Sequence, residues 1–302
     1  MEFLYFLEKC RLPGLNELML AVTTLGEETA FLVIGLIIFW CVDKRKGYYI
    51  MSVGFLGTML NQILKLSFRI PRPWVRDPNF TILEQAKEAA AGYSFPSGHT
   101  QTAVGTFGAI ASYTEKKWLR VICVIFAILV GFSRMYIGVH TPADVLVAAL
   151  CALILVFVLK KPLLEGSDGK MKAVFAMIIG FALIFFSYVH LWDFPIDIDA
   201  HNLESGMKNA YTMLGCTVGI AVVYVADKKW LNFPVEAKLW VQLIKIILGL
   251  LLVLAVKEGL RAPLELVLPT YPARALRYFL IVLTAGILWP MSFKYISKLG
   301  VK

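Results

Sequence analysis

The chain alternates between long apolar runs and short polar connections. A membrane-spanning helix needs about 20 mostly apolar residues. Runs of this kind predict nine spanning helices, at residues 27–42, 47–67, 98–114, 118–138, 142–160, 172–191, 207–226, 239–257 and 275–296. Because Glu27 and Glu28 interrupt the apolar stretch that starts at Leu18, we expect residues 1–25 to form an amphipathic segment at the membrane interface. The pattern predicts an all-α, polytopic membrane helical bundle of about nine transmembrane helices with an N-terminal interfacial helix.

Composition supports a protein embedded in lipid. Of the 302 residues, 59% are hydrophobic and 17% are charged, and the mean hydropathy is +0.71. Soluble domains carry about 45–50% apolar and about 25% charged residues. These values exclude a soluble enzyme, a disordered chain and a disulfide-rich secreted domain. The five cysteines are odd in number and lie mostly in apolar runs, so we expect buried thiols.

The net charge of +9 is distributed in clusters rather than along one basic face, so we expect no nucleic-acid partner. Every second connection is rich in lysine, namely those with Lys44 and Lys46, Lys116 and Lys117, Lys160 and Lys161, Lys228 and Lys229, and Lys294 and Lys298. Cytoplasmic connections carry the excess of Lys and Arg. We therefore predict an integral multi-pass membrane protein with its N-terminus outside and its C-terminus in the cytoplasm. It would lie in the plasma or inner membrane of a bacterium, or in the endoplasmic reticulum of a eukaryote.

Three polar clusters at span ends are unusual for simple loops. They are Lys65 to Arg72-Pro73, then Pro96-Ser97-Gly98-His99, and Ser133-Arg134 to His140 and Asp144. The predicted topology places all three at one membrane face, opposite the lysine-rich connections. A single histidine at a span end is usually an interface residue, and a lone Pro-Ser-Gly is usually a turn. Three such clusters on the same face instead indicate one site.

Phosphoryl transfer needs this set of side chains, because negative charge spreads over three equatorial oxygens in its transition state. Arg72 and Arg134 can bind those oxygens as forks, and Lys65 adds a point charge. Ser97 and the amides at a helix N-terminus can add donors, and Gly98 lets phosphate approach the backbone.

Two histidines divide the remaining chemistry. Asp144 follows His140 by one helical turn, so its carboxylate can hold Nδ1–H and leave Nε2 free to attack phosphorus. His140 is therefore the predicted nucleophile, forming a phosphohistidine. His99 is the predicted general acid, and afterwards the base that activates water.

The three clusters resemble the three-part signature of the type 2 phosphatidic acid phosphatase superfamily. The patterns are Lys-x6-Arg-Pro, Pro-Ser-Gly-His and Ser-Arg-x5-His-x3-Asp, all within residues 65–144. The resemblance implies the same roles for Lys65, Arg72, Ser97, Gly98, His99, Arg134, His140 and Asp144, and it implies phosphatase activity without metal or other cofactor. The segments around Leu25 to Glu28 and Phe39 to Asp43 resemble sphingosine-phosphate phosphatases, and nine spans resemble glucose-6-phosphatase.

These features lead us to expect an integral membrane phosphatase of a lipid phosphate, with its site on the non-cytoplasmic face. Candidate substrates are a sphingoid-base phosphate, phosphatidic acid, and an isoprenyl phosphate or diphosphate. A phosphatase of a soluble sugar phosphate, or a lipid transporter or flippase, remains an alternative. We expect residues 26–165 to form the catalytic core and residues 166–302 to add C-terminal spans.

The C-terminal part offers weaker signals. Lys245 lies within a predicted span, and we expect it to snorkel to the cytoplasmic side. Lys257, Glu258 and Arg261 lie at the outer face, where interface anchoring is more common than binding of a head group. The segment from His190 to His201 contains several aspartates, which we interpret as an acidic, solvated loop rather than a metal site.

Overall fold

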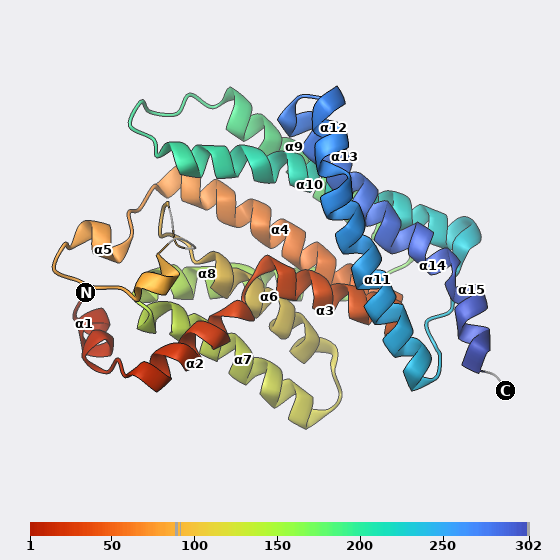
Figure 1. The fold of residues 1–302 in the computed structure, drawn as a ribbon, viewed down its shortest axis with the longest axis horizontal. Helices are drawn as coiled ribbons and strands as arrows, with labels where there is room; N and C mark the ends of the chain where they lie inside the picture. Colours follow the sequence, from red (N-terminus) through yellow and green to blue (C-terminus); the bar gives the residue numbers. More distant parts are fainter. Residues whose placement is uncertain (88–89, 91, 301–302) are drawn as a thin grey trace.

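The computed structural model describes residues 1–87, 90 and 92–300, which fold into a bundle of helices (Figure 1). The helices are α1 (Glu2–Lys9), α2 (Pro13–Thr24), α3 (Glu28–Cys41), α4 (Lys44–Phe68), α5 (Pro73–Arg76), α6 (Gly98–Tyr113), α7 (Lys117–Tyr136), α8 (Pro142–Leu164), α9 (Asp168–Leu191), α10 (Ala200–Ala226), α11 (Leu239–Gly259), α12 (Arg261–Val267), α13 (Thr270–Leu283), α14 (Trp289–Met291) and α15 (Phe293–Ile296). No β-strand occurs in the described residues. The all-α prediction is confirmed.

Each of the nine predicted spans coincides with a helix, but fewer are long and apolar enough to cross a membrane. In the described part of the chain 6 helices meet that condition, or up to 7 if α2 and α3, which are bent by 51°, count as one span. The predicted number of nine is therefore too high by this measure. The two remaining helices are α4, which carries charged residues at both ends, and α6, which has only 16 residues.

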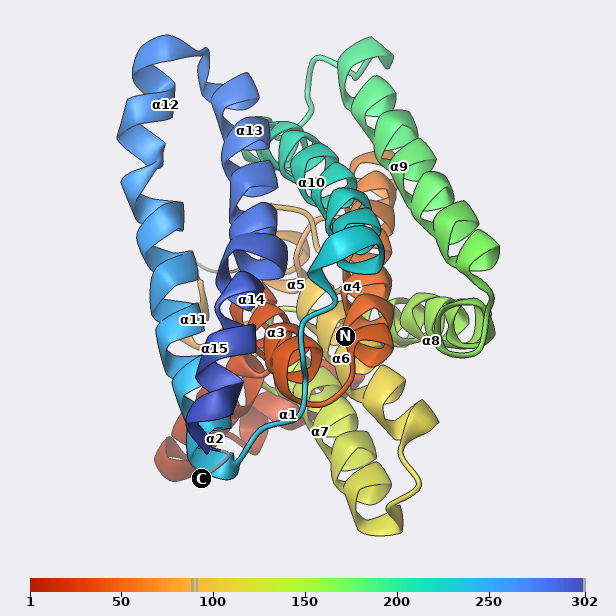
Figure 2. The ribbon, with the colours of Figure 1, turned by 90° about the vertical axis from the view of Figure 1, so that its right-hand side faces the viewer.

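α4 and α6 tolerate this polarity because other helices surround them. α4 contacts α3, α6, α8, α9 and α10, and α6 contacts α3, α4, α7 and α8. Figure 2 shows α11 and α13 on one side of α10 and α9 on the other. Polar side chains within such a bundle face protein or a cavity instead of lipid. This position is what allows α4 and α6 to carry two of the signature clusters.

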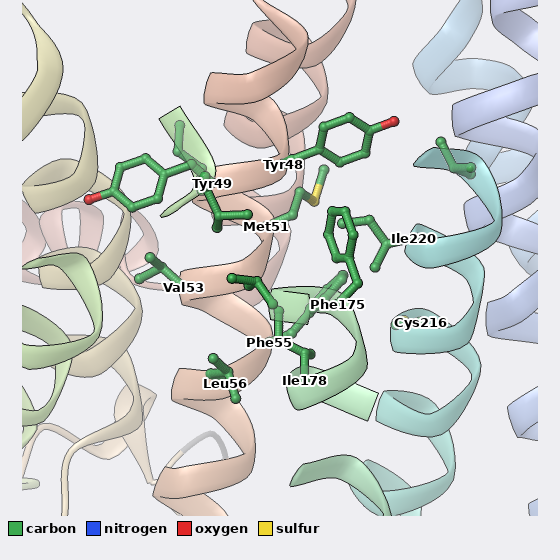
Figure 3. Close-up of a cluster of buried hydrophobic side chains, with 14 of the residues drawn as sticks. Tyr48, Tyr49, Met51, Val53, Phe55, Leu56, Phe175, Ile178, Cys216 and Ile220 are labelled. Atoms are coloured by element: carbon green, nitrogen blue, oxygen red, sulfur yellow. The ribbon is translucent and has the colours of Figure 1, made fainter. Parts of the chain in front are cut away.

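One core joins the two halves of the chain. Figure 3 shows Phe55 on α4 beside Phe175 and Ile178 on α9, with Ile220 of α10 completing the cluster. Since lipid tails are as apolar as these side chains, close packing rather than transfer from water holds such helices together. α10 also approaches α13 closely at Gly215, where a Cβ atom would lie 2.1 Å from the Ala275 carbonyl oxygen.

The lysine-rich connections meet at one end of the bundle. The Lys44 ammonium lies 2.8 Å from the Asp227 carboxylate, and Lys160 donates a 2.6 Å hydrogen bond to the Ser112 carbonyl. Lys245 reaches toward this end, where it donates to the carbonyls of Pro234 and Val235 at 3.2 and 3.1 Å. Lys245 thus extends in the expected direction, but it ends within the protein: it is fully buried, with its ammonium 4.6 Å from the centre of the Phe293 ring.

Candidate active site

The three signature clusters converge on one cavity at the opposite end of the bundle. The cavity has a volume of about 400 Å³. The signature residues that line it are Lys65, Arg72, Gly98, His99, Arg134 and His140. The other two predicted residues, Ser97 and Asp144, are buried immediately behind this wall, at 0% and 2% exposure. The structure thus brings together residues that are up to 79 positions apart in the chain, between Lys65 and Asp144.

His140 is positioned by the turn that follows α7. The backbone amides of Val139 and His140 both donate to the Arg134 carbonyl, at 3.1 and 3.2 Å. Gly138 makes this turn with a φ of 90°, a conformation that residues with a Cβ rarely adopt. The turn directs the imidazole inward, where it is only 2% exposed.

The hydrogen bonds around His140 determine its tautomer. Its Nε2 lies 2.9 Å from Nη1 of Arg72, which also donates to the Val139 carbonyl at 3.0 Å. A guanidinium has donors only, so Nε2 accepts and the ring proton must lie on Nδ1. That atom faces Oδ2 of Asp144 at 3.5 Å and Oγ of Ser94 at 3.4 Å. Nε2 is therefore the nitrogen with the lone pair.

Asp144 is held by the first turn of α8. Thr141 and Asp144 form a capping box, in which the Asp144 carboxylate accepts the Thr141 amide at 2.7 Å. The same oxygen accepts a 2.5 Å hydrogen bond from Ser94, which is fully buried. Sequence reasoning did not single out Ser94, because a serine outside the Pro-Ser-Gly-His pattern has no distinguishing signal. Ser94 and the capping box together fix the carboxylate behind the imidazole.

Three cations surround the imidazole. Lys65 donates to the Tyr93 carbonyl at 2.7 Å, and Arg72 donates through Nε to the Gly92 carbonyl at 3.1 Å. Arg134 is 2% exposed and donates through Nη1 to Thr23 at 2.8 Å, while its buried Nε has no hydrogen-bond partner in the described residues. An unpaired buried donor is costly unless a ligand meets it. The arrangement is suited to an oxyanion.

The start of α6 forms the adjoining wall. The Ser97 hydroxyl caps this helix, accepting from the Thr100 amide at 3.4 Å and from the Thr100 hydroxyl at 2.9 Å. A Cβ added to Gly98 would find no atom nearer than Asn61 Oδ1, at 3.8 Å, so the backbone here is open to the cavity. Ser97 therefore orders the helix N-terminus, and Gly98 leaves its amides accessible.

His99 lies against the bend between α2 and α3. A Cβ added to Gly26 would lie 2.8 Å from the His99 carbonyl oxygen and 2.8 Å from Cγ1 of Val130, so only glycine permits this contact. Its imidazole lines the cavity and has no hydrogen-bond partner among the described residues. The N-terminal segment thus borders the site, a relation that the sequence did not indicate.

Burial and charge keep His140 neutral. Loss of solvation is the largest effect, and the nearby charges of Arg72, Arg134 and Lys65 add to it, so the pKa of His140 lies well below its ordinary value of 6.5. Burial also lowers the pKa of Arg72 to about 10, against a smaller opposing effect of Asp144. A neutral imidazole beside guanidinium groups can attack an electrophile at neutral pH.

Two family models match the chain. The PAP2 superfamily model matches residues 45–163, and the PAP2 superfamily phosphatase transmembrane extension matches residues 211–300. Phosphatidylglycerophosphatase B of Bacillus subtilis is 32% identical over 177 residues, covering 54% of this chain and 79% of that protein. The chain belongs to the PAP2 superfamily.

Other relatives of this PAP2 phosphatase share shorter regions. Undecaprenyl-diphosphatase BcrC of Bacillus subtilis is 33% identical, covering 42% of this chain and 64% of that protein. A probable sphingosine-1-phosphate phosphatase of Dictyostelium discoideum is 32% identical, covering 43% and 34%. The crystal structure of Aquifex aeolicus LpxE is 29% identical, with a TM-score of 0.48 and coverage of 53% of this chain and 93% of that chain. The resemblance drawn from the three motifs is confirmed at the level of the family, and membership favours a membrane phosphatase over a transporter.

The remaining sequence candidates lie outside this PAP2 site. Lys257 and Glu258 form an exposed ion pair of 3.4 Å on α11 and do not line the cavity. No group of three or more His, Cys, Asp or Glu side chains that could hold a metal ion occurs in the part of the chain that the structure describes. One residue of the acidic segment does reach the site, because His201 lines the cavity from the first turn of α10.

Proposed function

We propose that this PAP2 phosphatase hydrolyses the phosphate ester of a lipid phosphate through a phosphohistidine at His140. The observation that carries the proposal is the 2.9 Å contact between Arg72 and Nε2 of His140, at the base of a cavity that also exposes Lys65 and Arg134. Asp144 completes the arrangement from the opposite side of the ring. An acceptor nitrogen beside three cations suits attack on a phosphate better than any other common electrophile.

The geometry suggests the order of events. The phosphate oxygens accept hydrogen bonds from Arg72, Arg134 and Lys65. Arg72 then no longer donates to Nε2 of His140, so the lone pair of that nitrogen becomes free to react. Nε2 then forms a bond to phosphorus as the ester bond breaks, and His99 gives a proton to the leaving oxygen. The imidazolium charge that develops is stabilised by Asp144 through Nδ1–H. Water, deprotonated by His99, next attacks phosphorus as the Nε2–phosphorus bond breaks, which releases inorganic phosphate and returns both histidines to their starting state.

Relatives support a lipid substrate. Three of them are named as phosphatases of phosphatidylglycerophosphate, undecaprenyl diphosphate and sphingosine 1-phosphate. A phosphatase of a soluble sugar phosphate is the second candidate, supported by 26% identity to glucose-6-phosphatase 3 of Rattus norvegicus. We propose that the reaction needs no cofactor, because Lys65, Arg72 and Arg134 supply the positive charge that a metal would otherwise provide.

Phosphate release by the purified protein tests the function. We expect turnover of at least one lipid phosphate in a panel of phosphatidic acid, phosphatidylglycerol phosphate, sphingoid-base phosphate, isoprenyl phosphate and diphosphate, and glucose 6-phosphate. Orthovanadate should inhibit, because it occupies a five-coordinate geometry like that of the transition state, whereas EDTA should leave the rate unchanged. Loss of activity on chelation would argue for a metal-dependent mechanism instead, and no turnover of any ester would reject the proposal.

The active site is proposed to lie on the non-cytoplasmic face, because the cavity and the lysine-rich connections are at opposite ends of the bundle. Cys10, which is exposed, lies at the cavity end, where the Tyr136 hydroxyl donates to its carbonyl. An impermeant thiol reagent applied to intact cells should label Cys10. In a Cys10→Ser background, Lys116→Cys should be labelled only after the membrane is permeabilised. Labelling of Lys116→Cys in sealed cells would reverse the proposed orientation.

A further inference from the structure

The cavity beside the phosphate-binding residues is polar on every described wall. No Ala, Val, Leu, Ile, Met, Phe, Tyr or Trp is among its described lining residues. A site that received part of an acyl or isoprenyl chain would have an apolar wall, since most small-molecule pockets are lined predominantly by hydrophobic side chains. The lining side chains therefore favour polar groups over the chain of a lipid.

The volume is larger than a phosphate needs. The cavity measures about 400 Å³. Each water occupies about 30 Å³ of liquid, so this space corresponds to roughly 13 waters, whereas a phosphate group has only five heavy atoms. Space therefore remains for the group that carries the phosphate.

Glu27 and Glu28 form one side of this additional space. Both line the cavity from the bend between α2 and α3, and both are exposed residues. Neither carboxylate forms a salt bridge or a side-chain hydrogen bond within the described residues. An ionised carboxylate only accepts hydrogen bonds, so the complementary ligand groups must be donors.

α10 forms the facing side. His201, Ser205 and Asn209 line the cavity and recur at intervals of four, which places them on one face of that helix. Imidazole, hydroxyl and amide groups both donate and accept. This face suits a ligand with several hydroxyl groups, because each hydroxyl also does both.

Gln101 provides an independent observation. Its side chain lines the cavity and is 4% exposed, and both Oε1 and Nε2 lack a hydrogen-bond partner in the described structure. A buried amide without partners costs free energy until something pairs with it. A ligand hydroxyl that lies between the two amide atoms, or a pair of neighbouring hydroxyls, would satisfy it.

We propose that the substrate of this site is a phosphate ester of a polyol, a group with free hydroxyls next to its phosphate, and that any lipid chain remains outside the cavity. The inference rests on the proposed phosphatase function. A polyol fits better than an ammonium group, because Gln101, Ser205 and Asn209 both donate and accept hydrogen bonds, which hydroxyls match and an ammonium, a donor only, does not. The polyol can be the glycerol head group of a lipid or a free sugar.

Matched substrates test the inference. Phosphatidylglycerol phosphate carries a hydroxyl beside its phosphorylated carbon, whereas farnesyl phosphate and phosphatidic acid carry none there. We expect kcat/KM to favour the hydroxylated ester over farnesyl phosphate by about 100-fold or more, because sites built for hydroxyls strongly reject analogues that lack them. Comparison of glucose 6-phosphate with the lipid then distinguishes a soluble from a membrane source, and sphingosine 1-phosphate tests the ammonium alternative.

Variants test which residues produce the preference for hydroxylated esters. Gln101→Met removes the amide at similar size, and Ser205→Ala is a second, smaller change in case the first disturbs folding. Each should reduce the preference for the hydroxylated ester about tenfold, as expected for loss of one hydrogen bond to a buried polar partner. Glu28→Gln should reduce it as well, whereas Glu258→Gln, the same change at an exposed position outside the cavity, should not alter it.

The outcomes separate the two proposals. Activity that depends on His140 but is equal or higher on farnesyl phosphate would overturn the polyol inference alone. Preference for sphingosine 1-phosphate over all uncharged polyol esters would do the same in favour of an ammonium group. A hydroxyl preference that persists in folded Gln101→Met, Ser205→Ala and Glu28→Gln proteins would also overturn it. Turnover that survives in His140→Ala would instead reject the proposed function.

Discussion

Replacement of His140 by alanine should lower phosphate release about 10⁴-fold or more, the scale seen when a nucleophile is removed from a catalytic unit. His140 supplies the only described ring nitrogen that lies 2.9 Å from Arg72 and faces Asp144 from its other side. Among the described residues of the cavity, no other group combines an acceptor nitrogen with a carboxylate partner that stabilises the charge formed on attack. The measurement is single-turnover hydrolysis of the preferred lipid phosphate in detergent.

Controls separate chemistry from folding. His190→Ala removes an exposed histidine of α9 that stacks on Phe186, and it should retain wild-type turnover. Thermal unfolding of His140→Ala and His140→Asn would show whether the buried site remains folded. Wild-type protein quenched during turnover should carry acid-labile phosphate on His140. Substantial turnover in folded His140→Ala, or labelled phosphate at another residue, would reject the nucleophile assignment.

Replacement of Asp144 by asparagine should lower kcat about 10³- to 10⁴-fold and change KM much less, as in catalytic triads. The asparagine oxygen can still accept the Thr141 amide that Asp144 accepts at 2.7 Å. Because Oδ2 of Asp144 makes that contact and also faces Nδ1 of His140 at 3.5 Å, an asparagine oxygen in its place keeps both contacts but lacks the negative charge that stabilises the imidazolium formed on attack.

Asp168→Asn is the matched control for this change. Asp168 also lies in the first turn of a helix, α9. Unlike Asp144, it is exposed, forms a 2.6 Å ion pair with Lys172 and lies outside the signature. The control should keep wild-type kcat, since Asp168 contacts Lys172 and Tyr224 and does not line the cavity. An unchanged kcat in Asp144→Asn would contradict the positioning role, and an equal loss in both variants would indicate a structural cause.

The sequence alone predicted the helices and indicated the candidate reacting groups. Apolar runs separated by charged connections are local signals, and each predicted span lies where a helix forms. The motif around His140 and Asp144 was also readable, because one helical turn between them places both at the start of the same helix. The three clusters gather at the end of the bundle opposite the lysine-rich connections, and which side of the membrane that end faces stays a prediction. These features depend on neighbours within a few turns, so the linear order contains them.

Only the tertiary structure decided what surrounds those groups. The close contact of Gly26 with His99, the hydrogen bond from Ser94 to Asp144, and the α10 face with Ser205 all join segments distant in the chain. Which helices cover α4 and α6 also depends on the packing of the whole bundle, and the sequence alone did not indicate it. Contacts between distant segments arise from packing of the whole bundle. That packing brings the residues of the signature together around a polar cavity, which has room for the group that carries the phosphate.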